Sequence, residues 1–370
     1  MQDKPYIALG LMSGTSLDGI DAAFIETNGK DILSFGPSLC LPYPDRSLLQ
    51  DTIKSALVWG FEGPRPEIFS RAQDYLDRAH IRAVNRICTV HPDWGQRLDV
   101  IGYHGQTVLH YPAQDGFMGQ SVQLGNGAAL AAEFGVPCVY DFRSADIAAN
   151  GQGAPLAPIY HEALCRSSMF FGRVAVVNIG GVSNVTFVAP DTDLRASDCG
   201  PGNGPLDSWV EHHSGKAYDK DGTLSMAGNV RQDLVDNWFK RDFFSRPMPR
   251  SADRYDFDVL DELRGVSLTN GAASLAAFCA QAIARDVKGF APDTVIICGG
   301  GRHNKAIMQM LSAHIDAEIL TSENVAWDGD GLEAQAFAFL AVRSLRRFPI
   351  SFKGTTGVAQ DMSGGVVALP

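Results

Sequence analysis

The segment "GLMSGTSLDGIDAAF", residues 10–24, holds a run of small and polar residues between two apolar runs. The apolar runs extend over residues 6–13 and 19–27, and each is typical of a buried β-strand. A tight hairpin needs only about two turn residues, so this connection is longer than the turn requires. Its glycines and hydroxyl groups suit a hairpin tip that presents N–H and O–H donors to phosphate oxygens.

A second hairpin of the same kind is predicted over residues 173–190, "RVAVVNIGGVSNVTFVAP", with Gly180 and Gly181 at its tip. A glycine turn then follows the buried strand in "DTVIICGGGRHNKAIMQML", residues 293–311, and precedes a helix. Because glycine has no side chain, the backbone of such a turn lets the flat base of a nucleotide approach closely. Two hairpin tips in separate halves and one glycine turn predict a nucleotide held in a cleft between two domains.

Two common phosphate-binding motifs are excluded. A Walker A loop needs a lysine before its Ser/Thr and a helix after it, whereas the first hairpin has no lysine and continues into a strand. A Rossmann fingerprint also needs a helix directly after its glycines, and both hairpins lack one. An isolated glycine-rich hairpin is more often a plain turn, and that alternative applies to each hairpin taken alone.

The remaining pattern predicts an α/β chain with two domains. We expect domain 1 over residues 1–150 and domain 2 over residues 151–345, with the tail at 346–370 returning to domain 1. Further strands are expected at residues 31–41, 99–105 and 136–142, and helices at 48–59, 66–87, 125–135, 154–165, 272–284 and 331–347.

Composition and charge exclude several classes of protein. The 370 residues are 45% hydrophobic and 20% charged, as in ordinary globular proteins. A net charge of −11 opposes broad binding to nucleic acid or to an anionic membrane. The seven cysteines form no CxxC pair and no zinc-site spacing, which predicts reduced thiols in a cytoplasmic protein. The N-terminus lacks a signal-peptide pattern, and the apolar helix at 272–284 is too short to cross a bilayer.

Six motifs occur in order along nearly the whole chain and together resemble the anhydro-N-acetylmuramic acid kinase family. They are "GLMSGTSLDGIDAA", "HGQT" (104–107), "GQGAPLAP" (151–158), "NIGGVSN" (178–184), "DCGPGN" (198–203) and "CGGGRHN" (298–304). The resemblance implies two RNase H-like domains of the sugar kinase/Hsp70/actin architecture, with an interdomain ATP cleft. It also implies a reaction in murein recycling: 1,6-anhydro-N-acetylmuramate, ATP and water give N-acetylmuramate 6-phosphate and ADP.

The expected ATP contacts come from all three glycine-containing segments. By the resemblance, residues 14–21 form an ATP-binding stretch, and the two later turns add backbone contacts. These residues are Gly14, Thr15, Ser16, Leu17, Asp18, Gly19, Ile20, Asp21, Gly180, Gly181, Gly299, Gly300 and Gly301. Mg²⁺ usually keeps several waters and binds through phosphates and one or two carboxylates. We therefore expect Mg²⁺ with ATP and assign no protein ligand to it, since Asp18 is equally well explained as a turn residue.

The resemblance places the catalytic carboxylate at Asp198. Water is a poor nucleophile toward an anomeric carbon, so a carboxylate should accept its proton. The Gly-Pro-Gly-Asn that follows predicts a tight turn presenting Asp198, and the alternative is that this aspartate only caps the turn. The family pattern has Thr after this Asp, whereas Cys199 stands here, which leaves any hydroxyl contact at this position open.

Four residues are candidates for sugar binding. A bidentate arginine suits the lactyl carboxylate of a muramyl sugar, and Arg143 is the candidate, with a surface salt bridge to Asp146 as the alternative. His104 and Gln106 are expected at the end of a strand, and Gln152 lies in a Gln-Gly turn.

Two other functions stay open on sequence grounds. One is a kinase of another amino sugar or a hexose, and the other is a non-sugar actin-like ATPase module. The sequence does not decide the oligomeric state, for which a homodimer is one alternative.

Overall fold

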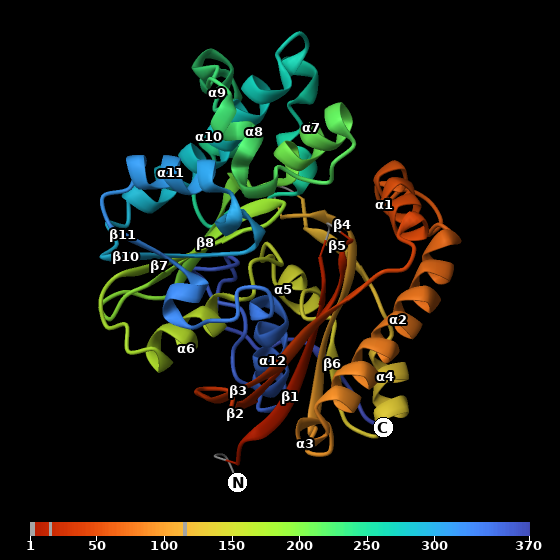
Figure 1. Ribbon diagram of the computed structural model, residues 1–370. Coiled ribbons are helices and arrows are strands. Elements are labelled where there is room, and N and C mark those ends of the chain that lie inside the picture. Colours follow the sequence, from red (N-terminus) through yellow and green to blue (C-terminus); the bar gives the residue numbers. More distant parts are fainter. Residues whose placement is uncertain (1–3, 15–16, 114–116) are drawn as a thin grey trace. The chain divides into compact units, whose positions relative to one another are not determined.

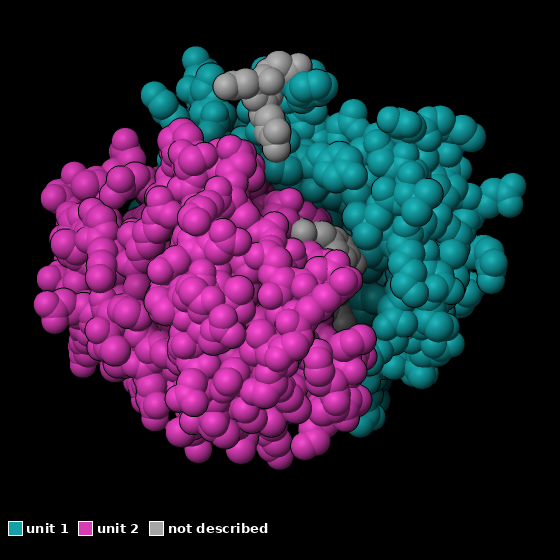
Figure 2. All heavy atoms as spheres, turned by 90° about the horizontal axis from the view of Figure 1, so that it is seen from above, with its two compact units in different colours: residues 1–167, 331–370 teal, residues 168–330 magenta. Residues whose placement is uncertain are grey.

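The computed structural model describes residues 4–14, 17–113 and 117–370, with the backbone alone for Arg254 and Tyr255. The chain forms two compact units, coloured separately in Figure 2. Unit 1 comprises residues 1–167 and 331–370, and unit 2 comprises residues 168–330. Figure 1 labels the helices and strands of both.

Unit 1 is a mixed sheet with helices on both faces. The strand order is β12-β6-β4-β1-β2-β3, and β5 pairs with β4. Its strands are β1 (Tyr6–Ser13), β2 (Gly19–Thr27), β3 (Ile32–Pro42), β4 (Val100–Tyr111), β5 (Gln120–Leu124), β6 (Cys138–Tyr140) and β12 (Val366–Ala368). Its helices are α1 (Ser47–Trp59), α2 (Ile68–Val90), α3 (Pro92–Gly95), α4 (Gly127–Phe134), α5 (Ser144–Ala148), α6 (Pro158–Ser167) and α12 (Leu332–Leu345).

Unit 2 has a smaller sheet in the order β11-β10-β7-β8-β9. Its strands are β7 (Val174–Ile179), β8 (Val182–Val188), β9 (Arg195–Pro201), β10 (Thr294–Cys298) and β11 (Glu318–Thr321). Its α-helices are α7 (Gly204–Ser214), α8 (Thr223–Ala227), α9 (Gln232–Trp238), α10 (Leu268–Lys288) and α11 (Lys305–His314). Single turns of 3-10 helix are η1 (Lys220–Gly222), η2 (Asp242–Ser245), η3 (Arg254–Phe257), η4 (Leu260–Leu263), η5 (Gly300–His303) and η6 (Ser322–Val325).

The two sheets share one topology. In each, the first two strands form an antiparallel hairpin, β1–β2 and β7–β8, and a third antiparallel strand follows at the edge. In each, the next two strands in the order, β4 and β6 or β10 and β11, run parallel to the first strand. The predicted α/β class, with one hairpin of the same kind in each half, is therefore confirmed.

Two paired glycines let α12 pack closely on the sheet of unit 1. Gly10 of β1 and Gly102 of β4 lie side by side in register. A Cβ added at Gly10 would lie 1.7 Å from the carbonyl oxygen of Ala334, and one at Gly102 would lie 2.1 Å from that of Phe337. The helix can rest on the strands only where no side chain intervenes. Residues 331–345 therefore pack in unit 1, which also contains residues 151–167, whereas the sequence placed both segments in the second domain.

Strand β4 differs from its prediction. The sequence suggested an end at Gly105, but the strand continues to Tyr111. Gly105 has a φ of 73°, in the left-handed region, and the pairing with β1 shifts there. Such an irregularity bends the strand locally without ending it. Beyond it β4 pairs with β5, a strand that the sequence did not reveal.

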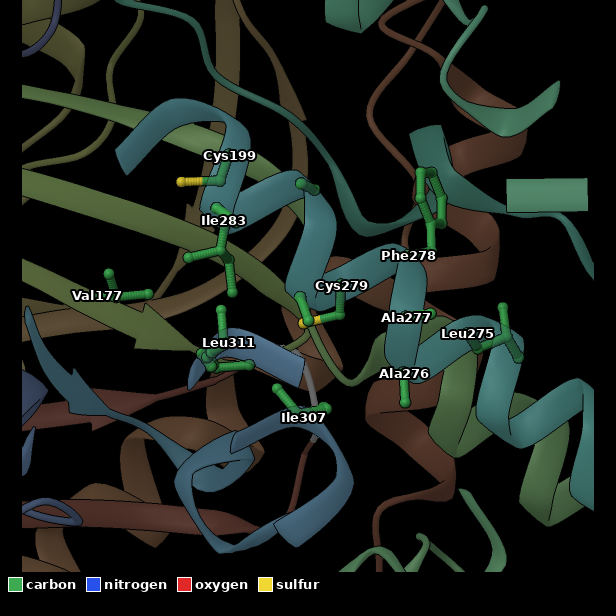
Figure 3. Close-up of a cluster of buried hydrophobic side chains, with 14 of the residues drawn as sticks. Val177, Cys199, Leu275, Ala276, Ala277, Phe278, Cys279, Ile283, Ile307 and Leu311 are labelled. Atoms are coloured by element: carbon green, nitrogen blue, oxygen red, sulfur yellow. The ribbon is translucent and has the colours of Figure 1, made fainter. Parts of the chain in front are cut away.

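The core of unit 2 surrounds α10 (Figure 3). Its small residues, including Ala276 and Cys279, let the sheet and α11 approach the helix, where Val177, Ile283 and Leu311 pack. This confirms the predicted buried helix. All seven cysteines lie in the described part, and Cys138, Cys165, Cys199 and Cys279 are buried there. None of the helices in the described ranges combines the length and apolar character that a bilayer crossing requires.

Buried histidines predict acid sensitivity. Burial lowers the pKa of His80 and His161 to about 4 and that of His110 to about 3. The unfolded chain takes up these protons near the ordinary pKa of about 6.5. Stability is therefore lost as the pH falls from about 6.5 toward 4, by about 1.4 kcal/mol per pH unit for each histidine.

We test this with His161→Gln and urea unfolding at several pH values. The variant removes one protonation site, so its free energy of unfolding should fall less steeply below pH 6.5 than that of the wild type. The exposed His303→Gln serves as control. Equal slopes for His161→Gln and the wild type would contradict the prediction.

Candidate active site

The second hairpin tip rests on the start of α7. The carbonyl oxygen of Gly181 accepts hydrogen bonds from the N–H groups of Gly202 and Gly204, both at 3.1 Å, and that of Gly180 accepts one from Asn203 at 2.7 Å. A Cβ at Gly202 would lie 2.1 Å from the Gly180 oxygen, so this contact needs a glycine. The turn is thus held rigidly from one side.

A side chain would fit beside Gly180 without a clash. A Cβ added there meets no heavy atom closer than 3.6 Å, and its φ is not in the left-handed region. The same holds for Gly300, where the nearest atom is Nδ2 of Asn203 at 3.7 Å. At Gly180 and Gly300 the backbone therefore carries no side chain and would accept one without a clash.

The glycine turn after β10 lies against the end of β7. Gly299 has a φ of 73°, and a Cβ there would lie 2.3 Å from Oδ1 of Asn178. A Cβ at Gly301 would meet Ile179 at 2.2 Å and Asn203 at 3.3 Å. The structure therefore brings the predicted residues of both turns in unit 2 together, around Asn203.

Arg302 braces this turn, a role that the sequence did not reveal. Its guanidinium donates to the carbonyl oxygen of Gly299 at 2.9 Å. It also forms ion pairs with Glu323 at 2.6 Å and Asp330 at 2.8 Å, while its side chain is only 3% exposed. The sequence feature that could have indicated this role is an arginine directly after three glycines.

The first hairpin tip is described only in part, because Thr15 and Ser16 lie outside the described residues. Leu17 has a φ of 58° and is buried in an apolar cluster with residues of α1 and α2, and Ile20 is buried in the sheet core. Their side chains anchor the tip. Asp18 is exposed, with its carboxylate 3.8 Å from Arg46, and Asp21 lies within β2, opposite Met12.

Gln106 lies beneath this tip. Its Oε1 accepts a hydrogen bond from the Ser13 hydroxyl at 2.5 Å, and its Nε2 donates to the carbonyl oxygen of Gly14 at 3.2 Å. The same Ser13 oxygen lies 2.7 Å from the hydroxyl of Tyr43. Gln106 thus braces the first hairpin tip through its side-chain amide.

Arg143 and His104 form a connected pair in unit 1. Nη2 of Arg143 lies 2.9 Å from Nε2 of His104, and its Nη1 donates to the carbonyl oxygen of Gly153 at 2.6 Å. Burial, and then the charge of Arg143, lower the pKa of His104 well below its ordinary value. The neutral ring accepts from Arg143 through Nε2 and donates through Nδ1 to the Gly105 oxygen at 2.9 Å.

The turn beside this pair is fixed by Asp146. Its Oδ1 accepts from the N–H of Gly153 at 2.7 Å, and its Oδ2 accepts from the hydroxyl of Thr356 at 2.5 Å. Asp146 is only 1% exposed, so it is no partner for a surface salt bridge. Gln152 donates to the Ala113 oxygen at 2.9 Å. Three of the four predicted sugar-binding residues therefore gather at one turn.

Asp198 lies inside β9, not on a turn. The sequence predicted a tight turn directly after Asp198, but the strand continues to Pro201 and pairs with β8, so a strand and not a turn positions this side chain. Asp198 is paired with Asn184, and Asn184 with Asn178 of β7. Paired residues on neighbouring strands share a face, so a polar row runs from Asp198 to the glycine turn at Gly299.

This row is the part of the site that the sequence reading missed. The sequence feature that could have revealed it is the pair of asparagines, Asn178 and Asn184, at the two ends of "NIGGVSN". The hairpin places these two residues opposite one another. The Asp198 side chain is buried, at 7% exposure. Its Oδ2 accepts a hydrogen bond of 2.8 Å from the N–H of Ala252.

Cys199 points the other way, into the core of unit 2 (Figure 3). Adjacent residues of a strand face opposite sides of the sheet, and the β8–β9 register shifts at this point. Burial raises the pKa of its thiol well above the ordinary value. The negative charge of Asp286 on α10 contributes to the same rise in pKa. The residue that replaces the family threonine is thus a core residue.

The described residues contain no group of three or more His, Cys, Asp or Glu side chains that could hold a metal ion.

A family model described as "Anhydro-N-acetylmuramic acid kinase" matches residues 6–369. An anhydro-N-acetylmuramic acid kinase of Rhizobium rhizogenes is 44% identical over 99% of this chain and 100% of its own length. One of Acidiphilium cryptum is 46% identical over 98% of each chain. Among solved structures, component A of an Acidaminococcus fermentans (R)-2-hydroxyglutaryl-CoA dehydratase aligns over 92% of this chain and all of its own, with a TM-score of 0.46 and 12% identity.

The family model and the curated relatives define a kinase. The chain belongs to the anhydro-N-acetylmuramic acid kinase family.

Proposed function

We propose that this protein uses ATP and water to convert 1,6-anhydro-N-acetylmuramate into N-acetylmuramate 6-phosphate and ADP. The reaction opens the anhydro ring and phosphorylates the oxygen that the opening releases. The scattered cysteines, with no CxxC pair, support a cytoplasmic location, and the reaction suits the recycling of murein fragments.

The observation that carries this proposal is the buried Asp198 on a polar row that leads to a glycine turn. As general base, Asp198 takes a proton from water while the water oxygen bonds the anomeric carbon. The bond between that carbon and O6 breaks, and O6 bonds the γ-phosphorus as the bond to ADP breaks. Because the phosphoryl group receives O6, a second carboxylic acid of the kind that glycosidases use is unnecessary.

The phosphate contacts are proposed at the glycine turns. In unit 2 these are Gly180, Gly181 and the turn at residues 299–301, where a Cβ at Gly180 or Gly300 would meet no atom closer than 3.6 Å. In unit 1, residues 14–21 are proposed to bind ATP, as the family resemblance implies. Mg²⁺ would be held mainly by the phosphates and would neutralise charge during transfer.

Sugar recognition is proposed at Arg143, with His104 and Gln152 at the same turn and Gln106 beneath the first hairpin tip of unit 1. The guanidinium is held at two points, by Nε2 of His104 and by the Gly153 oxygen. A guanidinium fixed in this way suits bidentate binding of the lactyl carboxylate. The neutral His104 orients Arg143 without adding a second charge.

We predict that Arg143→Lys raises the KM for 1,6-anhydro-N-acetylmuramate at least about tenfold, with little change in kcat. Lysine keeps the charge but not the planar pair of donors, and a bond to a charged group contributes about 1.5–3 kcal/mol. Steady-state kinetics should be compared with 1,6-anhydro-N-acetylglucosamine, which has no lactyl group. The exposed Arg71→Lys serves as control. Equal losses with both sugars would show that Arg143 does not read the carboxylate.

The proposed function is tested by incubating the purified protein with ATP and candidate sugars. We expect ADP formation to require the anhydro-muramyl sugar, and mass analysis to show a product heavier by one water and one phosphoryl group. Preferred turnover of an open hexose or amino sugar, or ATP hydrolysis without any sugar, would contradict the proposal.

A further inference from the structure

Residues 250–252 run along the outer edge of β9, which is the edge strand of its sheet. The N–H of Asp198 donates to the carbonyl oxygen of Arg250 at 2.9 Å. The N–H of Arg250 donates to the hydroxyl of Ser197 at 3.1 Å. The N–H of Ala252 donates to Oδ2 of Asp198 at 2.8 Å. This short segment therefore holds both the backbone and the carboxylate of Asp198.

The segment is in turn tied to the core by the side chain of Arg250. Its Nη2 lies 2.6 Å from Oδ2 of Asp286 on α10, and the two side chains are only 7% and 6% exposed. The guanidinium lies 4.7 Å from the centre of the Phe243 ring, and Nη1 donates to the Arg246 oxygen at 3.2 Å. Arg250 thus has contacts on several sides, and its position is fixed.

We propose that Arg250 and Asp286 are positioning residues for Asp198. The ion pair holds residues 250–252 against β9, and the Ala252 N–H then fixes the plane of the Asp198 carboxylate. This inference rests on the proposed function of Asp198 as the base. Neither member of the pair touches a reacting atom.

A purely structural role is the alternative. A buried ion pair often adds little net stability compared with packed apolar residues of similar volume, although removing one partner alone is costly. A positioning role differs in its consequence: the fold survives replacement of both charges, but the carboxylate loses its orientation. Misplacement of a reacting group by about 1 Å lowers turnover by about 10²-fold.

The first test replaces both members of the pair, as Arg250→Met with Asp286→Leu, so that no buried charge is left unpaired. We expect kcat to fall by about tenfold to about 10²-fold, with the KM values for ATP and sugar unchanged. Circular dichroism and thermal melting report on the fold. Arg264→Met, which breaks an exposed pair with Asp261, is the control and should keep wild-type kinetics.

Two further variants decide the outcome even if the double replacement does not fold. Arg250→Lys keeps a charged donor for Asp286 and should retain most of kcat. Ala252→Pro removes the N–H that binds Asp198 and leaves the ion pair in place. It should show the same loss of kcat at unchanged KM.

The Asp198→Asn background separates this inference from the function it rests on. If the Arg250–Asp286 pair acts through Asp198, replacing the pair in the Asp198→Asn variant should lower kcat little further, because the two changes are coupled. The inference would be overturned if the fold-decreases in kcat from Asp198→Asn and from replacing the pair multiplied in the combined variant. Wild-type kcat in Ala252→Pro would also overturn it. Wild-type turnover in Asp198→Asn alone would overturn the base assignment itself.

Discussion

Asp198→Asn should lower turnover by about 10²–10⁴-fold, the usual contribution of a positioned general base. Asparagine keeps the size and shape of the side chain, and its amide oxygen can still accept the Ala252 N–H that now binds Oδ2. It cannot accept a proton from water. The loss should therefore appear in kcat, and isothermal titration should show nearly unchanged binding of an ATP analogue.

The same variant should lose both halves of the reaction together. O6 is not available to the phosphoryl group until the ring opens, so no phosphorylated closed sugar should accumulate. The ring should not open without ATP, because nothing then receives O6. More than about a tenth of wild-type turnover in Asp198→Asn would be too much for a lost general base, and the choice among the carboxylates would reopen.

Gly180→Val should abolish ATP use while the fold is retained. A Cβ at this position meets no atom closer than 3.6 Å, so unit 2 tolerates it. The branched side chain would then occupy the space that we assign to phosphate. Loss of such contacts lowers kcat/KM by about 10²-fold or more. The measurement is ATP-analogue binding together with thermal melting.

The control is Gly289→Val, at an exposed site just after α10 where the nearest atom is 3.8 Å away. It should bind ATP normally. Gly202→Ala gives the opposite pattern, because its Cβ would lie 2.1 Å from the Gly180 oxygen and should destabilise unit 2 directly. Normal ATP affinity in Gly180→Val would remove the phosphate site from this turn.

The hairpins and the buried helix were predictable because their signals are local. Apolar runs on both sides of a glycine-containing tip predict β1–β2 and β7–β8, and the apolar, alanine-rich sequence of α10 predicts its burial. The glycine turn after β10 was equally visible, since no side chain fits at Gly299 or Gly301.

The missed features depend on pairing between distant segments. β4 continues past Gly105 because β5 pairs with it there, and Asp198 lies in a strand because β8 lies beside it. Helix α12 packs in unit 1 because Gly10 and Gly102 leave room for it. The sequence does not show this, because the two glycines lie side by side only once β1 and β4 are paired. Likewise, the link from Arg250 to Asp198 passes through backbone atoms, which leave no residue pattern.

The central claim, that water opens the ring while O6 takes the phosphoryl group, is tested most directly by running the reaction in oxygen-18 water. The wild-type product should carry one label on its anomeric hydroxyl, and fragment masses should show none in the transferred phosphate. Label in the phosphate would mean that water attacked phosphorus instead of the anomeric carbon, and it would contradict the account.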